Sequence, residues 1–122
     1  MQEERVDEVG RKIELAWLTA FYGGLLTDKQ RQVLALHCEE DLSLAEIAQE
    51  AGVSRQGVHD MLTRAAQRLF DMEEKLGMAA RFQRMEEGLE ECRTLLRNKR
   101  YDEAEGVIDS LIRLDQEENN GL

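Results

Sequence analysis

Five polar side chains between residues 55 and 64 offer the clearest recognition chemistry in this sequence. They are two arginines, a glutamine, a histidine and a threonine: Arg55, Gln56, His59, Thr63 and Arg64. Arginine makes forked contacts to phosphate or carboxylate, and side chains of these types reach base edges when a helix enters a major groove. We therefore interpret the set as a surface for a nucleic acid or a protein partner. The alternative is a helix face that is merely solvated.

No other residues form a catalytic, metal-binding or cofactor-binding pattern. His59 has no carboxylate or cysteine at a suitable spacing, and His37 stands beside Cys38 without further ligands. The acidic run 39–41 could be a metal site, but such a run is more often a solvated loop. There is no glycine-rich phosphate loop, nucleophile elbow or pair of carboxylates. We predict a protein that is not an enzyme and needs no metal or cofactor.

The binding residues follow a segment with the spacing of a helix-turn-helix. Ala48 is small where two helices must cross closely, and Gly52 stands where a tight turn needs a positive φ. Ser54 is placed to cap the next helix, between the apolar Val53 and Val58. This pattern predicts a short helix, a glycine-containing turn and a second helix that faces a partner.

Capping patterns set the bounds of the helices around this motif. Two capping boxes and one single cap are present: Thr27 with Gln30, Ser43 with Glu46, and Ser54. They predict helices near residues 28–38, 44–51 and 55–69. The last helix has an apolar face made of Val58, Met61, Leu62, Ala65 and Leu69. The polar face lies opposite, with Arg55 and Arg64 at its flanks.

An earlier helix is expected from Arg5 to Phe21, with Gly23-Gly24 ending it. Its apolar residues follow steps of three and four: Val6, Val9, Ile13, Ala16, Trp17 and Ala20. We expect this stripe to pack across the motif and close the core. Trp17 and Phe21 are interpreted as core residues, the alternative being that they face a ligand.

Beyond residue 77 the pattern becomes that of a helical hairpin. One seam repeats in steps of four and three: Met78, Phe82, Met85, Leu89, Cys92 and Leu96. After a turn at 98–101, a cap formed by Asp102 with Glu105 precedes a helix buried at Ala104, Val107, Ile108, Leu111 and Ile112. We predict domains at 1–76 and 77–118, with a disordered tail at 119–122. Because the seam exceeds what one short helix covers, we expect the hairpin to support a homodimer.

Composition favours an all-α protein of the cytoplasm. The chain has 122 residues, no proline and 34% charged side chains. No apolar run is long enough for a membrane span, and the N-terminus lacks a signal-peptide core, so we expect no membrane insertion. Cys38 and Cys92 lack the spacing of a disulfide or metal framework.

The charge of the chain argues against simple binding to duplex DNA. The net charge is −10. Residues 27–70 alone hold five basic and seven acidic side chains. Asp60, on the polar face, would oppose phosphates. A DNA-binding protein usually shows a basic footprint instead.

Four segments together closely resemble the YlxM family of small bacterial proteins. They are Phe-Tyr-Gly-Gly-Leu-Leu-Thr-Asp-Lys-Gln at 21–30, Asp-Leu-Ser-Leu-Ala-Glu-Ile-Ala at 41–48, Gly-Val-Ser-Arg-Gln at 52–56 and Glu-Glu-Lys-Leu-Gly at 73–77. The resemblance implies a helix-turn-helix like region four of sigma factors, of the winged-helix-like class. It also implies a regulatory role in the signal recognition particle pathway, through the particle's RNA, its GTPase or both. It places the binding surface at Arg55, Gln56, His59 and Arg64.

Two functions are open at this point. The first is an accessory protein of the signal recognition particle, and the second is a DNA-binding transcriptional regulator. The acidity of the motif favours the first. Gly57 stands where the family pattern has a helix-forming residue, usually alanine. Restoring alanine there should stabilise the fold by about 0.5–1 kcal/mol if the position is helical.

Overall fold

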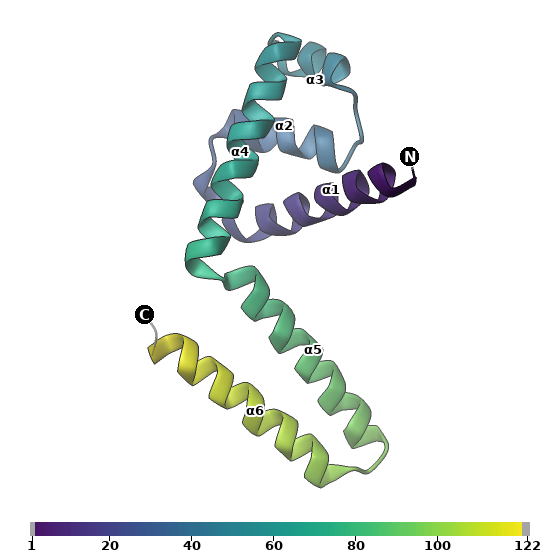
Figure 1. Ribbon diagram of the computed structural model, residues 1–122, viewed down its shortest axis with the longest axis vertical. Helices are drawn as coiled ribbons and strands as arrows, with labels where there is room; N and C mark the ends of the chain where they lie inside the picture. The colour runs from purple at the N-terminus through teal and green to yellow at the C-terminus, as the bar shows by residue number, and fades with distance from the viewer. Residues whose placement is uncertain (1, 121–122) are drawn as a thin grey trace. The chain divides into compact units, whose positions relative to one another are not determined.

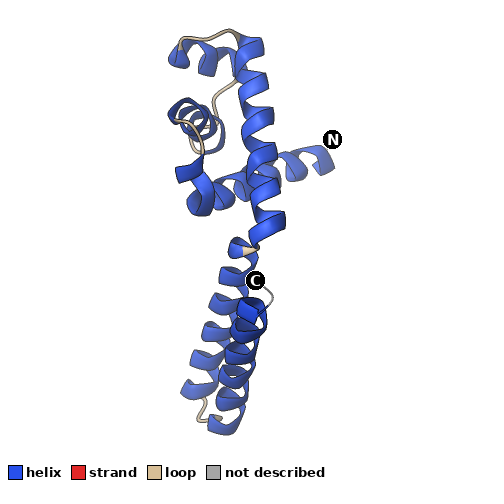
Figure 2. Ribbon diagram, turned by 90° about the vertical axis from the view of Figure 1, so that its left-hand side faces the viewer, coloured by secondary structure: helices blue, strands red, loops and turns tan. Residues whose placement is uncertain are grey.

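The computed structural model describes the backbone of residues 2–120 and the side chains of residues 8–116. Every secondary-structure element in this range is helical, as Figure 2 shows, so the predicted all-α class is confirmed. The elements are α1 (Gln2–Tyr22), the short 3-10 helix η1 (Gly23–Leu25), α2 (Asp28–Cys38), α3 (Leu44–Ala51), α4 (Arg55–Leu76), α5 (Met78–Arg97) and α6 (Tyr101–Asn120). None of the helices in the described part combines the length and the apolar character that a membrane span requires.

The chain divides into two compact units, one ending at Ala79 and the other beginning at Ala80. We call the first the helix-turn-helix unit and the second the hairpin unit; Figure 1 shows both. Helix α6 of the hairpin unit continues to Asn120, and residues 121–122 of the expected tail lie outside the described residues.

The helices of the helix-turn-helix unit begin at the caps that the sequence predicts. Thr27 Oγ1 accepts a hydrogen bond from the Gln30 backbone N–H, and Gln30 Oε1 accepts one from the Thr27 N–H, both at 3.1 Å. The same reciprocal pair joins Ser43 and Glu46. Ser54 caps α4 through its hydroxyl. Because each cap satisfies amide donors that a helix N-terminus leaves open, α2, α3 and α4 start where expected.

Left-handed glycines end α3 and α4. Gly52 has φ 70° and Gly77 has φ 62°, a conformation that only glycine adopts at little cost. Helix α4 therefore extends past the expected end near residue 69 and stops at Leu76. The turn between α3 and α4 is the one that the motif predicts.

Two apolar clusters fill the helix-turn-helix unit. The larger one joins α1, α2 and α4 and buries Leu15, Leu18, Tyr22, Leu26, Leu34, Ala65, Ala66, Leu69 and Ala79. The smaller one lies between α2, α3 and α4 and buries Val33, Ile47, Ala51 and Val58. The second cluster fixes α3 against α4, so the helix-turn-helix geometry rests on a packed core.

The buried face of α1 differs from the predicted stripe. Val9 and Ile13 are 58% and 64% exposed, whereas Leu15, Leu18 and Tyr22 are buried. Both rows have helical spacing, but the second carries larger side chains at the contact with α2 and α4 and buries more apolar area. Val6, the first residue of the predicted stripe, lies outside the described side chains.

Trp17 and Phe21 are partly buried and pack against the larger cluster, in line with their interpretation as core residues. Their rings lie edge to face with centroids 5.1 Å apart. The glycines after α1 do not end it in the left-handed manner, because positive φ angles among the described glycines occur at Gly52 and Gly77. Helix α1 tightens into η1 instead.

A hydrogen-bond network joins the end of α1 to the end of α4. The Tyr22 hydroxyl donates to Glu73 Oε1 at 2.6 Å and accepts from the Met78 backbone N–H at 3.1 Å. Glu73 Oε1 also accepts from the Ala79 N–H at 3.0 Å. The side chains of Tyr22 and Glu73 thereby cap the first amides of α5. These two residues are 51 positions apart in the sequence.

The hairpin unit consists of α6 and most of α5, which run antiparallel (Figure 1). The turn between them contains Lys99 at φ 59°. Helix α6 begins at Tyr101, so Asp102 lies in its first turn and is not the cap that the sequence suggested. An acidic residue in the first turn still complements the helix dipole.

The contact between α5 and α6 coincides only in part with the predicted seam, of which Met85 is half-buried and Cys92 buried. Gly88 and Cys92 are buried on α5, and Cys92 Sγ lies 3.7 Å from the Ala104 carbonyl oxygen. A Cβ at Gly88 would come within 2.5–2.9 Å of Leu111. Small residues let the two backbones approach closely, which the larger side chains of the predicted row would prevent.

Several predicted seam positions are therefore exposed. On α5 they are Met78, Phe82, Leu89 and Leu96, at 45–55% exposure. On α6, Ala104 is buried and Val107 and Leu111 are half-buried, as expected, but Ile108 and Ile112 are 41% and 50% exposed. The predicted hairpin is therefore present, and its contact agrees with the predicted rows at Met85, Cys92, Ala104, Val107 and Leu111 and differs from them at the exposed positions.

Candidate functional site

The five predicted binding residues share the exposed face of α4. Arg55, Gln56, His59, Thr63 and Arg64 are all exposed. The opposite face is closed by a row of buried residues: Val58, Ala65, Ala66 and Leu69. The structure thus brings the predicted set onto one helix, with the buried row facing away from it.

The N-terminal part of α4 is held by the turn and by the smaller apolar cluster. The Gly52 backbone N–H donates to the Ala48 carbonyl at 3.0 Å, which closes the end of α3. Ser54 Oγ accepts from the Gly57 N–H at 2.9 Å, and Val58 is fully buried against α3. The residues at the start of α4 therefore stand on a rigid support while their side chains remain in solvent.

Asp60 occupies the centre of this face. The Gln56 amide donates to Asp60 Oδ1 at 3.1 Å, and His59 Nδ1 lies 3.8 Å from the same oxygen. Thr63 Oγ1 donates to the His59 carbonyl at 2.9 Å. Gln56 and Thr63 thus have internal partners within α4, and the middle of the face carries a negative charge.

The cations of the motif fall into two groups. Three of them make structural contacts: Lys29 donates to the Ala51 carbonyl, Arg31 pairs with Asp28, and Arg68 donates to the Leu25 carbonyl at 2.9 Å. Within the described residues no hydrogen bond or ion pair joins Arg55 or Arg64. These two arginines are nine positions apart on α4, which corresponds to about 13 Å along the helix axis. They are the cations of the motif that remain available to a ligand.

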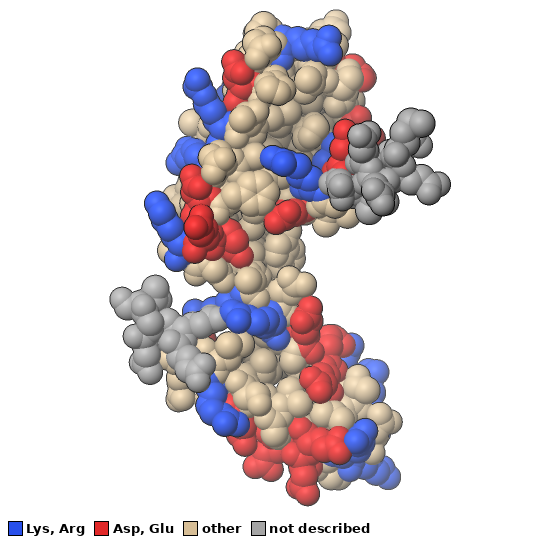
Figure 3. Space-filling model, viewed as in Figure 1, with Lys and Arg blue, Asp and Glu red and all other residues tan. Residues whose placement is uncertain are grey.

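The surface around α4 is not a basic field. Figure 3 shows Lys and Arg interspersed with Asp and Glu over the visible face of the helix-turn-helix unit. Beside α3, Leu42, Glu46, Gln49 and Glu50 line a shallow hollow, which adds acidic side chains close to the motif. A ligand of this face meets isolated arginines in a mixed-charge setting.

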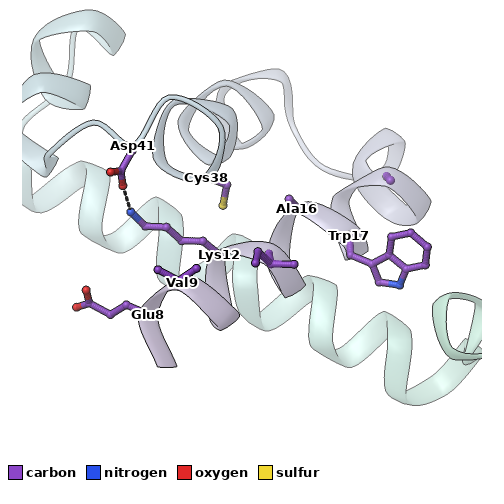
Figure 4. A pocket seen from close by; sticks show the side chains of 9 residues that line it. Glu8, Val9, Lys12, Ala16, Trp17, Cys38 and Asp41 are labelled. Carbon is purple, nitrogen blue, oxygen red and sulfur yellow. Dashed lines mark hydrogen bonds and ion pairs between the residues drawn. The ribbon is translucent and has the colours of Figure 1, made fainter. Parts of the chain in front are cut away.

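An open groove lies along the exposed apolar row of α1 and was not predicted. It encloses about 700 Å³ and is lined by Glu8, Val9, Lys12, Ile13, Ala16, Trp17, Ala20, Cys38 and Asp41. Figure 4 shows Lys12 reaching across from α1 to Asp41, and Cys38 pointing from α2 towards α1. The sequence signal was present in the predicted α1 stripe, which we had assigned to the core.

Charge and burial shift the pKa values of two titratable groups in this groove, Asp41 and Cys38. Lys12 donates a hydrogen bond to the Asp41 carboxylate, and this bond and the positive charge of the ammonium lower the pKa of Asp41. Asp41 itself adopts a left-handed φ of 53°. Burial raises the pKa of the Cys38 thiol, so the thiol stays protonated at neutral pH. Nowhere in the described range do three or more His, Cys, Asp or Glu side chains gather as metal ligands would.

Comparison with known proteins places the chain in a family. The sequence model of UPF0122, described as "Putative helix-turn-helix protein, YlxM / p13 like", matches residues 9–107. A UPF0122 protein of Desulforamulus reducens is 47% identical over 65% of this chain and 68% of its own length. The corresponding protein of Bacillus pumilus is 41% identical over 81% of this chain and 91% of its own length.

A third relative covers still more of the sequence. The UPF0122 protein of Clostridium kluyveri is 38% identical over 88% of this chain and 84% of its own length. The matched region includes the helix-turn-helix unit and most of the hairpin unit. The family description names a helix-turn-helix protein and no enzymatic activity. The chain belongs to the UPF0122 family of YlxM-like helix-turn-helix proteins.

Proposed function

We propose that this protein is a regulatory accessory protein of the signal recognition particle pathway in the cytoplasm. In this proposal the exposed face of α4 binds the particle's RNA or its GTPase. Family membership and the resemblance of the helix-turn-helix unit to YlxM proteins support the pathway. The single observation that carries the binding site is the pair Arg55 and Arg64, which are exposed at the two flanks of that face and have no hydrogen-bond or ion-pair partner among the described residues.

The chemistry of the pair suits local contacts to phosphate or carboxylate. Each guanidinium presents a planar fork of donors to such groups. Affinity for random duplex DNA requires many phosphate contacts, each contributing about −0.9 to the slope of log affinity against log salt. With Lys29, Arg31 and Arg68 engaged elsewhere and Asp60 at the centre of the face, few such contacts remain. Weak binding to random duplex DNA is therefore part of the proposal.

The second candidate function is a DNA-binding transcriptional regulator with a domain like sigma region four. The helix-turn-helix order favours it: α3 ends at the left-handed Gly52, and α4 follows. In such proteins the second helix enters the major groove with its exposed N-terminal part. The acidic surroundings of α4 count against it. The two candidates differ in the ligand of the same face.

The test is a titration of the full chain against four ligands: the particle's RNA, its GTPase, the assembled particle and a promoter-sized DNA fragment. The binding variant is Arg55→Ala/Arg64→Ala. A matched control is Arg31→Ala/Lys75→Ala, which removes the same charge from exposed positions elsewhere in the unit. We expect the binding variant to lose at least about tenfold in affinity for the particle or one of its components, because hydrogen bonds to charged groups are lost. The control should bind nearly as well as the wild type.

The salt dependence identifies the component. RNA binding through both arginines should lose about 1.5 units of salt slope in the variant, whereas binding to the GTPase should depend less on salt. Tight, sequence-selective binding to the DNA fragment with no affinity for the particle would refute the proposal and establish the regulator.

A further inference from the structure

Besides Phe82 at 45%, the described part of the hairpin unit exposes five large apolar side chains. They are Leu89, Leu96, Tyr101, Ile108 and Ile112, at 41–60% exposure. Single exposed apolar residues are common on protein surfaces and need no explanation. The arrangement of these five is different, because their positions on the two helices fall on the same side of the hairpin.

Four of these residues follow directly after a buried or half-buried residue of the contact, and Tyr101 is the first residue of α6. Leu89 follows Gly88, which packs on Leu111, and Ile112 follows Leu111 itself. Consecutive residues of an α-helix are turned by about 100°, in the same sense on both helices. Because α5 and α6 are antiparallel, this rotation brings both rows to the same side of the hairpin. We call this surface the apolar side and define it by the five residues.

The opposite side of the hairpin is polar. It is formed by the residues that directly precede those at the contact: Arg84, Glu91, Glu103 and Ser110, all exposed. A hairpin that is solvated all round would carry polar residues on both sides. A helix that packs against more than one neighbour carries a wider apolar stripe. Such a stripe has two contact positions and one flanking position in each heptad.

The contact between α5 and α6 fully buries few side chains. Cys92 and Ala104 are buried, Gly88 contributes no side chain, Met85, Leu95, Val107, Leu111 and Leu114 are half-buried, and Arg81 pairs with Asp115. Units of about 40 residues generally need a metal, disulfides or a partner to fold stably. Cys92 and Cys38 are free, and no metal-binding group occurs among the described residues. Burial of the apolar side would add stability to this contact.

We propose that the apolar side packs against the same side of a second copy of this chain, forming a four-helix bundle. The five side chains present on the order of 500 Å² per copy, so two copies bury about 1,000 Å², the lower bound for a specific interface. A two-fold pair uses the same patch twice and needs no other partner.

The charges at the rim of the apolar side fit a second copy. Glu86 and Arg93 lie three residues before and four residues after Leu89, on the same face of α5. A two-fold axis near Leu89 with α5 crossing its copy antiparallel places Arg93 of each chain, which pairs with Glu90 of its own helix at 2.7 Å, opposite Glu86 of the other chain. This dimer does not depend on which ligand α4 binds, and four of its five interface residues, Leu89, Leu96, Ile108 and Ile112, belong to the rows that the sequence suggested.

The test measures the mass of the full chain by sedimentation equilibrium from about 1 to 100 µM, the range in which a moderate dimer assembles. The disrupting variant is Leu89→Lys/Ile108→Lys, at the middle of the apolar side. The matched control is Thr94→Lys/Ser110→Lys, which adds the same charge to exposed positions away from it. We expect the wild type and the control to be dimers and the disrupting variant to be a monomer with unchanged helical circular dichroism per chain.

A wild type that stays monomeric over this range, or a dimer that survives Leu89→Lys/Ile108→Lys, overturns the proposal. If the disrupting variant loses helical signal, Leu89→Ala decides instead. It must raise the dimer dissociation constant at least about tenfold, because one anchor of the patch is truncated on both copies. A smaller change also overturns the proposal. Because oligomeric mass needs no ligand, the result is independent of the titrations with the particle.

Discussion

The helix-turn-helix unit and the hairpin unit bury opposite kinds of side chain. In the first, Leu34, Ile47 and Leu69 are at most 2% exposed. In the second, the fully buried residues are a glycine, a cysteine and an alanine, Leu95, Leu111 and Leu114 are only half-buried, and the leucines and isoleucines of the apolar side are at least 41% exposed. Both units show helical apolar periodicity. Apolar periodicity therefore indicates a helix, whereas the size of the residues at the contact indicates whether the core is complete.

The largest expected effect is the loss of a core leucine from the helix-turn-helix unit. Leu69→Ala should lower the free energy of unfolding by about 3–4 kcal/mol, because Leu69 is fully buried and its removal leaves a cavity. The control is Leu25→Ala in the same unit, where the side chain is 60% exposed and the loss should stay below about 1 kcal/mol. Denaturant titration measures both. Similar values for the two variants would contradict a complete core in this unit.

The next effect concerns the network at Tyr22. Tyr22→Phe leaves Glu73 and the Met78 N–H without the phenol hydroxyl and should cost about 1–3 kcal/mol. Burial, together with the hydrogen bond to Glu73, raises the pKa of Tyr22 above its ordinary 10.0. The contribution is therefore complete below pH 10 and is lost as the pH rises through the folded-state pKa.

The two measurements that test this network are stability and its pH dependence. The free-energy difference between wild type and Tyr22→Phe should be constant from pH 7 to about pH 9 and shrink above pH 10. Tyr101→Phe is the control, because Tyr101 is 60% exposed and its substitution should change little in the monomer. A difference that grows at alkaline pH would show that the tyrosine is not stabilised in its protonated form.

Two glycine substitutions test how closely α5 and α6 approach each other in the hairpin unit. Gly88→Ala should destabilise the contact between α5 and α6 by about 1–2 kcal/mol, because the new Cβ would meet Leu111 at 2.5–2.9 Å. Gly106→Ala in α6 has open space around the Cβ position and should stabilise the helix by about 0.5–1 kcal/mol. Thermal unfolding followed by circular dichroism gives both values. Two stabilising substitutions would mean that α5 and α6 do not approach closely at Gly88.

Local chemistry made much of the first unit predictable. The caps at Thr27, Ser43 and Ser54 and the left-handed Gly52 depend on residues within a few positions of each other, so the sequence contains the whole interaction. The exposed face of α4 followed from one helical period and one buried row. The exposure of the five candidate binding residues on one side of α4 therefore followed from the sequence, whereas their role in binding stays a prediction.

Long-range choices were not predictable in the same way. Helix α1 offers two apolar rows of equal spacing, and only the packing on α2 and α4 selects the row with Leu15 and Leu18. The bond between Tyr22 and Glu73 joins two segments that carry the family resemblance, but no local rule connects them. In the hairpin unit, the close approach at Gly88 decides the register. The prediction favoured the large residues Phe82, Leu89 and Leu96, which the structure leaves exposed.

The smallest effect is expected at Gly57, the glycine of α4 that follows the Ser54 cap. The position is helical, as the sequence required, and alanine there gains up to about 1 kcal/mol of helix propensity. A Cβ would, however, lie 3.0 Å from Ser54 Oγ, the atom that accepts from the Gly57 N–H. Displacing that cap costs about as much as the propensity gains. Gly57→Ala alone should therefore change the free energy of unfolding by less than about 0.5 kcal/mol, in contrast to Gly106→Ala.

In a Ser54→Ala background the obstructing oxygen is absent, so Gly57→Ala should there stabilise the unit by about 0.5–1 kcal/mol. Denaturant midpoints of the four chains complete this double-mutant cycle, and a full gain already in the wild-type background would show that the serine moves aside without loss of its cap.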